Sequence, residues 1–176
     1  MNLPAASPIR RATPDDITAL VAIEHACFAG DRLDRRRFRY LLTAANAVTL
    51  IDEHKGVPRG YLMLLFRTNS SAARIYSIAT HPGHARSGVA ASLLGAAEAL
   101  ARRHGYRRQR LEIRADNQAS LSLFQQRGYQ AFGAYPAYYH DGMDAVRLEK
   151  TLVMAPLNGS LNGPLNGPIN GADRLP

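Results

Sequence analysis

The sequence is poor in cysteine and has no long apolar run. Cys27 is the single cysteine among 176 residues, which excludes an internal disulfide and a cysteine-based metal cluster. The N-terminal segment MNLPAASPIRRATPDD lacks an apolar stretch of signal-peptide length, and no later stretch approaches the roughly twenty apolar residues of a membrane span. We therefore expect a cytoplasmic protein with no membrane partner and no metal site.

Lysine is also scarce. Lys55 and Lys150 are the only lysines, so arginine supplies nearly all of the positive charge behind a formal net charge of +8. A basic protein can bind nucleic acid or another acidic partner. The arginine clusters at residues 35–37 and 107–108 are scattered, however, and no recognisable nucleic-acid-binding module surrounds them. Nucleic acid is therefore not expected as a partner.

The composition is otherwise that of a folded domain. Hydrophobic residues make up 46% and charged residues 20% of the chain, which is typical of a globular protein with one sizeable core. After Val153 the chain repeats a four-residue unit, Leu or Ile followed by Asn-Gly-x, which is too rich in turn residues for a core element. We predict one domain over residues 1–155 and a disordered tail over 156–176, with docking or tethering as an alternative role for the tail.

Periodic apolar residues predict a series of strands and helices. Thr13 caps the first helix, with Pro14 in its first turn and Asp16 in capping-box position, and a polar turn containing Gly56 and Pro58 joins two later strands. The expected elements are a strand at 9–13, helices at 14–28 and 34–42, strands at 47–55, 59–69 and from 75 to before the proline at 82, a helix at 88–105, a strand at 108–116, a helix at 117–128, and strands at 129–135 and 145–153. Three consecutive strands do not suit a doubly wound Rossmann sheet, so the fold class is α/β of the α+β kind, a mixed sheet flanked by helices.

Residues 75–94, IYSIATHPGHARSGVAASLL, combine a strand, a glycine loop and the start of a helix. The first backbone N–H groups of a helix have no partners within it, and together with the helix dipole they favour an anion. The two commonest nucleotide-phosphate loops, GxGxxG and GxxxxGK[ST], do not occur. The stretch therefore predicts an anion site of another kind, unless the loop only turns the chain.

Three features together resemble the GNAT superfamily of acyl-CoA-dependent N-acetyltransferases, over nearly all of residues 9–153. They are the loop HPGHARSGVA, the strand that carries Glu112, and the helix NQASLSLFQQRG followed by tyrosine. The superfamily loop has Gln or Arg, two residues, Gly, one residue, and Gly or Ala. Gly88 and Ala90 fit this pattern, whereas Ala85 stands where Gln or Arg is expected. The resemblance implies a mixed, mostly antiparallel sheet of about seven strands flanked by about four helices.

The resemblance also implies acetyl-CoA as co-substrate. Backbone N–H groups of the loop would hold its pyrophosphate, with the guanidinium of Arg86 compensating for Ala85, and the pantetheine arm would pair with the preceding strand. A strand N–H near Ile78 would stabilise the oxyanion. Asn117 and Phe124 would also contact the cofactor, with helix capping and core packing as the respective alternatives. The expected cofactor-binding residues are Ile78, Ala79, Thr80, Arg86, Ser87, Gly88, Val89, Ala90, Ala91, Asn117 and Phe124.

Glu112 is the expected catalytic residue. The segments LEIRADNQASLSLF and YYHDGMDA are similar to those of ribosomal-protein alanine N-acetyltransferases, in which the matching glutamate is the general base. Strand alternation puts Leu111 and Ile113 on one face and Glu112 and Arg114 on the other, so Glu112 can point into a cleft, with a surface ion pair to Arg114 as the alternative. At neutral pH an α-amine is uncharged on the order of a hundred times more often than a lysine, so an N-terminal acceptor demands less of this base.

Two segments depart from the ribosomal enzymes. Twelve residues after Glu112 those enzymes carry a tyrosine that protonates the departing thiolate, and this chain has Phe124. No acid role is assigned to Phe124, and the tyrosines that either substitute for it or line the acceptor cleft are Tyr135, Tyr138 and Tyr139. The segment AGDRLDRRRF, which helps to shape the acceptor site in the superfamily, also differs.

The expected function is transfer of an acetyl group from acetyl-CoA to a primary amine, with a peptide or protein N-terminal amine as the preferred acceptor. A small amine such as a polyamine or an aminoglycoside is the second acceptor class, because Asp31, Asp34 and Asp141 would attract a cation. The third interpretation is a catalytically weak acyl-CoA-binding module, motivated by Ala85 and Phe124.

Overall fold

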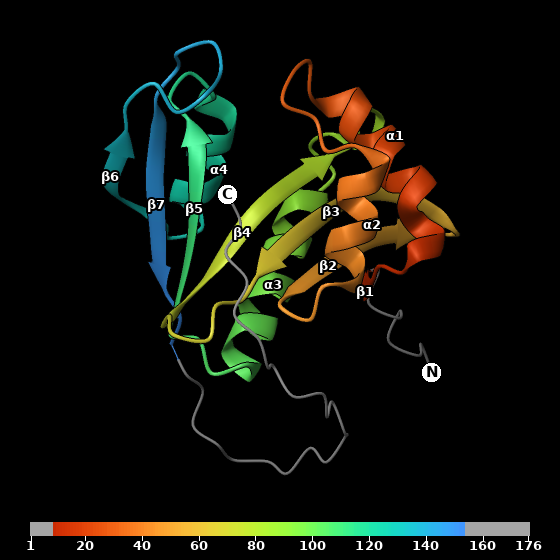
Figure 1. Cartoon of the computed structure of the whole chain (residues 1–176), viewed down its shortest axis with the longest axis horizontal. Helices are drawn as coiled ribbons and strands as arrows, with labels where there is room; N and C mark the ends of the chain where they lie inside the picture. Colours follow the sequence, from red (N-terminus) through yellow and green to blue (C-terminus); the bar gives the residue numbers. More distant parts are fainter. Residues whose placement is uncertain (1–8, 154–176) are drawn as a thin grey trace.

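The computed structural model describes residues 9–153, and the predicted series of strands and helices forms within that range (Figure 1). In chain order the elements are β1 (Ile9–Arg11), the 3-10 helix η1 (Pro14–Asp16), α1 (Ile17–Cys27), α2 (Arg35–Thr43), β2 (Ala47–His54), β3 (Val57–Leu65), β4 (Ala72–Thr80), the 3-10 helix η2 (Pro82–His84), α3 (Val89–Arg103), β5 (Arg108–Arg114), α4 (Gln118–Gln126), β6 (Gln130–Tyr135) and β7 (Ala145–Thr151). The predicted tail, residues 156–176, lies outside the described residues, as do both ends of the predicted domain 1–155.

The seven strands of residues 9–153 form one sheet in the order β1-β2-β3-β4-β5-β7-β6. All neighbouring strands are antiparallel except β4 and β5, which are parallel and joined by the crossover helix α3. A parallel pair needs such a crossover, whereas an antiparallel pair such as β2 and β3 can be joined by a short turn. The predicted mixed, mostly antiparallel sheet with four α-helices is therefore confirmed.

Hydrophobic residues cover the sheet in two separate clusters, one on each face. One cluster joins α3 and α4 to the sheet through buried side chains such as Leu93, Leu94 and Phe124. The other joins α1 and α2 through Leu20 and Phe38 on the opposite face. In Figure 1, α1 and α2 accordingly lie in front of β2 and β3, with α3 behind the sheet. None of the helices in residues 9–153 is long and apolar enough to cross a membrane.

Local sequence signals set the starts of the first two helices. The Asp16 carboxylate accepts a hydrogen bond from the Thr13 backbone N–H at 2.8 Å, so the predicted capping interaction is present. The first turn is the 3-10 helix η1, and α1 follows it directly. At the start of α2, Asp34 Oδ1 accepts from the Arg37 backbone N–H at 2.7 Å.

One turn prediction is wrong. Pro58 lies in β3 rather than in the turn, which is made by Lys55 and Gly56. The register between β2 and β3 shifts at Asp52 and Glu53, next to the pairing of Glu53 with Pro58. Proline has no N–H to donate, and an irregularity in the ladder is a place where a strand can hold it. β4 also begins three residues earlier than predicted, at Ala72.

β4 and β5 separate after a short paired segment, which opens the centre of the sheet. They pair only from Ala72 with Arg108 to Arg74 with Arg110, whereas β5 stays paired with β7 as far as Arg114. The register between β3 and β4 also shifts between Met63 and Leu64, leaving Tyr76 as an extra residue in β4. As a result, β4 and β5 diverge toward their C-terminal ends (Figure 1), and each leaves one backbone edge without a strand partner within residues 9–153.

Candidate functional site

The predicted strand segment Ile78, Ala79 and Thr80 lies on the diverging part of β4. On one side it pairs with β3, through Leu62 opposite Ile78. On the other side β5 has already separated, so this edge is free of any strand within the described chain. The Thr80 hydroxyl is buried without a hydrogen-bond partner among residues 9–153. The segment can therefore pair with an extended ligand, as an added strand would.

The predicted anion loop presents a row of unpaired donors. Within residues 9–153, the backbone N–H groups of residues 86–91 have no acceptor, and the first helical hydrogen bond runs from Ser92 N to Gly88 O at 2.9 Å. Gly88 has φ +82°, a left-handed conformation that glycine adopts without strain. Arg86 and Ser87 are exposed, so their side chains are accessible. This geometry suits an anion at the N-terminus of α3.

A close packing contact holds the start of α3 against the sheet. Val89 is buried, and its Cγ1 lies 2.7 Å from the place where a Cβ on Gly60 would stand. The carbonyl oxygen of Ala79 lies equally close to that place. Only glycine at position 60 allows this approach, because a real Cβ does not tolerate such distances. Gly60 therefore places the free edge of β4 next to the unpaired N–H groups.

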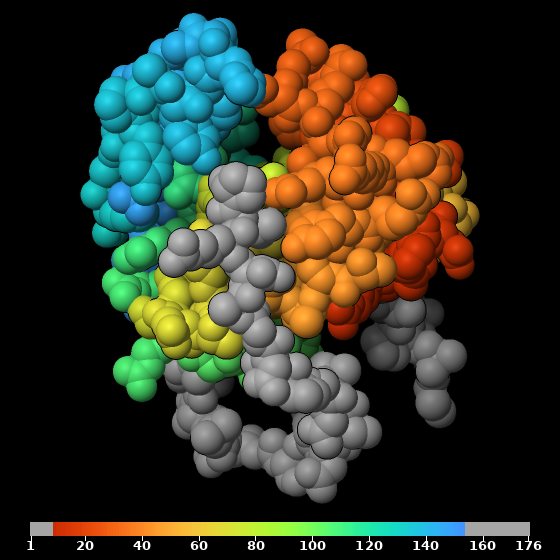
Figure 2. Space-filling model, in the orientation of Figure 1, coloured from red at the N-terminus to blue at the C-terminus, as the bar shows by residue number. Residues whose placement is uncertain are grey.

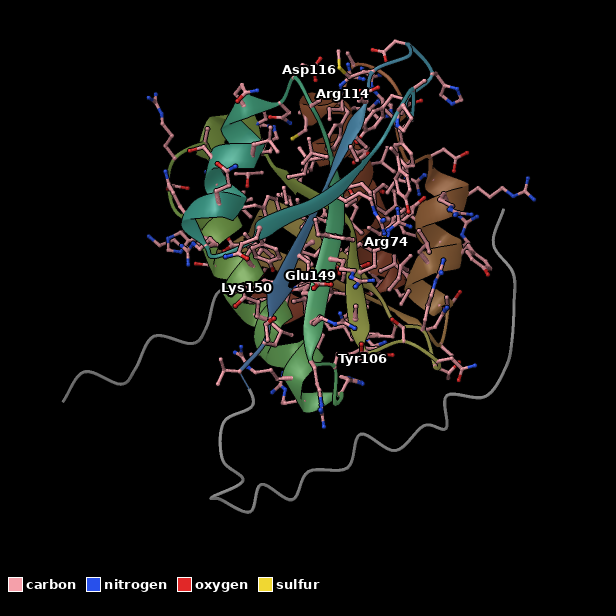
Figure 3. All side chains as sticks on the ribbon, turned by 90° about the vertical axis from the view of Figure 1, so that its left-hand side faces the viewer. Arg74, Tyr106, Arg114, Asp116, Glu149 and Lys150 are labelled. Carbon is pink, nitrogen blue, oxygen red and sulfur yellow. The ribbon has the colours of Figure 1, made fainter. Side chains whose placement is uncertain are left out.

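Glu112 points to the face of β5 that the alternation predicts. Leu111 and Ile113 are buried on the other face, while the Glu112 side chain is 10% exposed and its Oε2 accepts a hydrogen bond from Arg74 Nε at 2.8 Å. The alternative prediction, a surface ion pair between Glu112 and Arg114, is wrong, because Arg114 pairs with Asp116 and Asp141 instead. Figure 3 shows this separation: Arg114 and Asp116 lie near the top of the view, at the C-terminal end of β5, and Arg74 lies lower.

Arg74 ties Glu112 to the loop between β6 and β7. Its Nη2 donates to the Tyr138 hydroxyl at 3.3 Å. Burial alone would lower the pKa of the Arg74 guanidinium, but the Glu112 carboxylate outweighs burial, and the net shift is upward. In Figure 3, Arg74 lies on the side of the sheet toward α2, whereas Lys150 lies on the side toward α3. Arg74 is thus a fixed cation beside the predicted base.

The three candidate tyrosines form one aromatic group. Tyr135 and Tyr138 stack with ring centroids 5.6 Å apart, and Tyr139 packs edge-on against Tyr138. Burial raises the pKa of the Tyr139 phenol, and the Arg114 guanidinium lies 4.9 Å from the centre of its ring. Of the three, Tyr138 is the one hydrogen-bonded to Arg74. Their roles, as a substitute acid or as the lining of the acceptor cleft, stay predictions.

Asn117 and Phe124 have clear structural roles. Asn117 Oδ1 accepts a hydrogen bond from the Ser120 backbone N–H at 3.1 Å, so it caps α4. Phe124 is 1% exposed and packs edge-on against Tyr129. These contacts match the alternatives of capping and core packing, and the predicted cofactor contacts of both residues stay predictions.

Two surface loops enclose a hollow on the same side as Glu112. Figure 2 shows it between the α1–α2 loop and the β6–β7 loop. His140 Nε2 in the β6–β7 loop lies 3.4 Å from Asp31 Oδ1 in the α1–α2 loop, so the two loops meet. We call this hollow the groove. Within residues 9–153 there is no group of three or more His, Cys, Asp or Glu side chains that could hold a metal ion.

The sequence did not single out three residues that surround Glu112. Arg74 contacts it directly, and Arg147 Nε lies 4.0 Å from its Oε1. The Tyr76 ring lies beneath the Arg74 guanidinium, with its centre 5.8 Å from Arg74 Cζ. Alternation along β4 puts Arg74 and Tyr76 on one face, but the pairing of Arg147 with Glu112 depends on a register that the sequence does not state.

Known proteins share both the sequence pattern and the fold. Residues 17–129 match the family model described as the acetyltransferase (GNAT) family. The ribosomal-protein-S18-alanine N-acetyltransferase from Escherichia coli is structurally similar, with a TM-score of 0.75 and 22% identity, covering 87% of this chain and 98% of that one. A ribosomal-protein-alanine N-acetyltransferase from Brucella melitensis has a TM-score of 0.71 and 23% identity, covering 82% and 99%. The structure of yncA from Salmonella typhimurium with its cofactor acetyl-CoA has a TM-score of 0.71 and 23% identity, covering 87% and 98%. No curated protein sequence is significantly similar to this chain.

Proposed function

This chain belongs to the acetyltransferase (GNAT) family, and we propose that the amine it acetylates is the N-terminal amine of a peptide or protein. As a member it is an acyl-CoA-dependent acetyltransferase. The observation that carries the proposal is the position of Glu112, which Arg74 links to Tyr138 in the β6–β7 loop, one of the two loops that border the groove. A groove open at its surface suits a chain end better than it suits a buried small molecule. Two structural neighbours are named for acetylating an alanine of ribosomal proteins.

The described residues fit acetyl-CoA in two places. The unpaired N–H groups of residues 86–91 would hold the pyrophosphate, and the free edge of β4 at Ile78, Ala79 and Thr80 would pair with the pantetheine arm. When bound, acetyl-CoA supplies a thioester that a neutral amine can attack. Because the loop would bind through its backbone, Ala85 should lower affinity without abolishing it. The interpretation as a catalytically weak acyl-CoA-binding module keeps the same cofactor site, and sustained turnover on an amine would contradict it.

Glu112 would take the proton that the acceptor amine must lose. The carboxylate is 10% exposed and hydrogen-bonded to Arg74, which fixes its orientation. Because Arg74 and Arg147 are cations close to this point, they disfavour an ammonium there and favour the neutral amine. An α-amine, whose pKa is about 8, is converted to this form more easily than a lysine, whose pKa is about 10.4. The surroundings of Glu112 therefore support an N-terminal acceptor.

A polycationic acceptor is less well supported. The three acidic residues that would attract it already have partners: Asp34 caps α2, Asp141 pairs with Arg114, and Asp31 contacts His140. A polyamine or an aminoglycoside would have to displace these partners and also approach Arg74 and Arg147. Acetylation of a peptide N-terminus asks for neither. A cytoplasmic location belongs to the same proposal.

The test compares two glutamates on the same face of the sheet. Glu112→Gln should lower turnover on an N-terminal peptide by about 10² or more, the range for loss of a general base, with acetyl-CoA affinity unchanged by calorimetry. Glu149→Gln is the matched control, since Glu149 on β7 forms a comparable ion pair with Arg110 on β5. Equal turnover of the wild type and Glu112→Gln would remove the assignment of the base. Acetylation of polyamines but of no peptide would replace the proposed acceptor.

A further inference from the structure

Arginine and tyrosine side chains form a continuous strip from α2 to β7. Arg37 Nη2 donates to the Tyr76 hydroxyl at 3.5 Å, and the Arg74 guanidinium lies over the ring of Tyr76. Arg74 in turn donates to Tyr138, Tyr138 stacks on Tyr135, and the Arg147 guanidinium lies 4.4 Å from the centre of the Tyr135 ring. We call Arg37, Arg74, Tyr76, Tyr135, Tyr138 and Arg147 the arginine strip.

The arginine strip carries more positive than negative charge. Three guanidiniums belong to it, and Glu112 is the one carboxylate among residues 9–153 within 4.0 Å of any of them. The Arg37 guanidinium has no carboxylate that close within the described chain. Arg37 also lines an open pocket of about 340 Å³, together with Asp34, Arg36 and Tyr40. Arg147 Nε is buried and has no hydrogen-bond partner among these residues.

This surplus restricts what can lie along the strip. A guanidinium binds a carboxylate through paired, charge-assisted hydrogen bonds. Aromatic rings beneath Arg37, Arg74 and Arg147 hold the guanidiniums in place, so less side-chain freedom is lost when a carboxylate binds. A peptide with lysine or arginine near its N-terminus would instead bring like charges together, which costs affinity.

We propose that the acceptor carries negative charge close to its amine, as Asp or Glu side chains at its second to fourth residues, and that Arg37 and Arg147 determine this specificity. The inference rests on the proposed function, since it assumes that the acceptor amine reaches Glu112. An extended chain advances about 3.3 Å per residue, so a peptide whose first residue is at Glu112 lays its next residues along neighbouring side chains. Arg37 on α2 reaches Tyr76, and Arg147 on β7 lies 4.0 Å from Glu112, so the two arginines would border this path from opposite sides.

The test uses three peptides that share an N-terminal alanine and differ at the next three residues, which are acidic, the corresponding amides, or basic. We expect kcat/KM for the acidic peptide to exceed that for the amide peptide by about tenfold, and the basic peptide to be the poorest. Raising the salt from about 0.05 M to about 0.5 M should shrink this preference, because exposed charge pairs are screened. Free glutamate and spermidine are tested as further acceptors. They show whether the enzyme prefers an acidic peptide to a small anionic amine or to a polycationic amine.

Variants locate the preference on the strip. Arg37→Gln and Arg147→Gln should each reduce the ratio of acidic to amide peptide by about threefold, and Arg37→Lys should restore most of it. Arg39→Gln is the matched control, because it removes the same charge from an exposed position of α2 without an ion pair in the described chain. An unchanged ratio in both strip variants would overturn the assignment of these residues.

A binding measurement separates this inference from the proposed function. The same peptides, labelled at their C-termini, are titrated with the protein and followed by fluorescence anisotropy. Tighter binding of the acidic peptide without turnover would support the charge preference while overturning the peptide acceptor. Turnover at equal rates for the acidic and amide peptides, or faster turnover of the basic peptide, would overturn the charge preference while leaving the acceptor class in place.

Discussion

The two halves of the sheet differ in how many of their faces are buried. In the half formed by β1 to β4, helices and buried side chains cover both faces, and every residue of β2 from Ala47 to Asp52 is buried. Among residues 9–153, helices cover only one face of the half formed by β5, β7 and β6, and all residues of β6 are exposed. The bare face carries arginines, glutamates and aromatic rings, among them Arg110, Glu112, Phe132 and Arg147.

This difference separates stability from chemistry within one sheet. A face buried under helices contributes through apolar area removed from water. A face left in contact with solvent can keep charged groups hydrated while ion pairs and rings fix their positions. The two halves separate where β4 and β5 stop pairing, after Arg74 and Arg110. The proposed cofactor edge and the proposed base lie on either side of that separation.

The largest expected contrast is between two phenylalanines. Phe38 on α2 is fully buried, whereas Phe132 on β6 is 40% exposed. Phe38→Ala should lower the free energy of unfolding by about 3–5 kcal/mol, the usual cost of a large cavity, and Phe132→Ala by about 1 kcal/mol or less. Urea denaturation of both variants measures this. Equal losses would contradict the division of the sheet into a buried and an open half.

Gly60 tests the contact that joins the buried half to the predicted anion loop. A Cβ there would meet Ala79 O and Val89 Cγ1 at 2.7 Å, so Gly60→Ala should cost about 1–3 kcal/mol of stability through overpacking. It should also weaken acetyl-CoA binding, because the start of α3 must shift. Gly95→Ala, with nothing within 4 Å of its added Cβ, is the control and should leave binding unchanged. Intact binding in Gly60→Ala would show that the loop does not depend on this contact.

Arg74 tests whether the ion pair that joins β4 of the buried half to β5 of the open half serves activity more than stability. Arg74→Gln removes the hydrogen bonds to Glu112 and Tyr138, and kcat should fall by about tenfold because the carboxylate loses its orientation. Acetyl-CoA affinity should stay unchanged, and Arg74→Lys should recover part of kcat. Arg110→Gln breaks the neighbouring pair with Glu149 and provides the control. A loss of kcat as large in Arg110→Gln would point to a general effect of charge.

The smallest effect concerns an ion pair of the buried half. The hydrogen bond from Arg10 lowers the pKa of the Asp16 carboxyl. Its contribution to stability is therefore present above the ordinary carboxyl pKa, about 3.9, and is lost as the pH falls through the lower folded-state value. Asp16→Asn should remove up to about 1 kcal/mol at neutral pH and flatten the acid limb of thermal stability. Asp15→Asn is the control, and turnover should be unaffected in both.

Elements with a clear period were predictable from the sequence, and contacts between distant strands were not. Alternation along β5 correctly put Glu112 opposite Leu111 and Ile113, because a strand has a period of two. The pairing of Glu112 with Arg74 depends on a parallel register set across the crossover helix α3, and the two residues are 38 positions apart in the chain. No local pattern encodes such a register, so the sequence offered Arg114 instead.

Departures from simple rules account for the remaining differences. Pro58 enters β3 because the register shift beside it relieves the missing hydrogen bond. The bulge at Tyr76 follows from the pairing of β3 with β4 and has no signal of its own in the sequence. The role of Phe124 depended on tertiary burial, which puts it against Tyr129. The contact of Arg37 with Tyr76 joins α2 to β4, and no local sequence pattern predicts it.

The most direct test of the account is a calorimetric titration of the purified protein with acetyl-CoA, with ATP as a control for binding through phosphate alone. The unpaired N–H groups of residues 86–91 and the free edge of β4 predict saturable, micromolar binding of acetyl-CoA and no heat from ATP. Absence of acetyl-CoA binding, or equal binding of ATP, would contradict the assignment of the loop and of the open half of the sheet that depends on it.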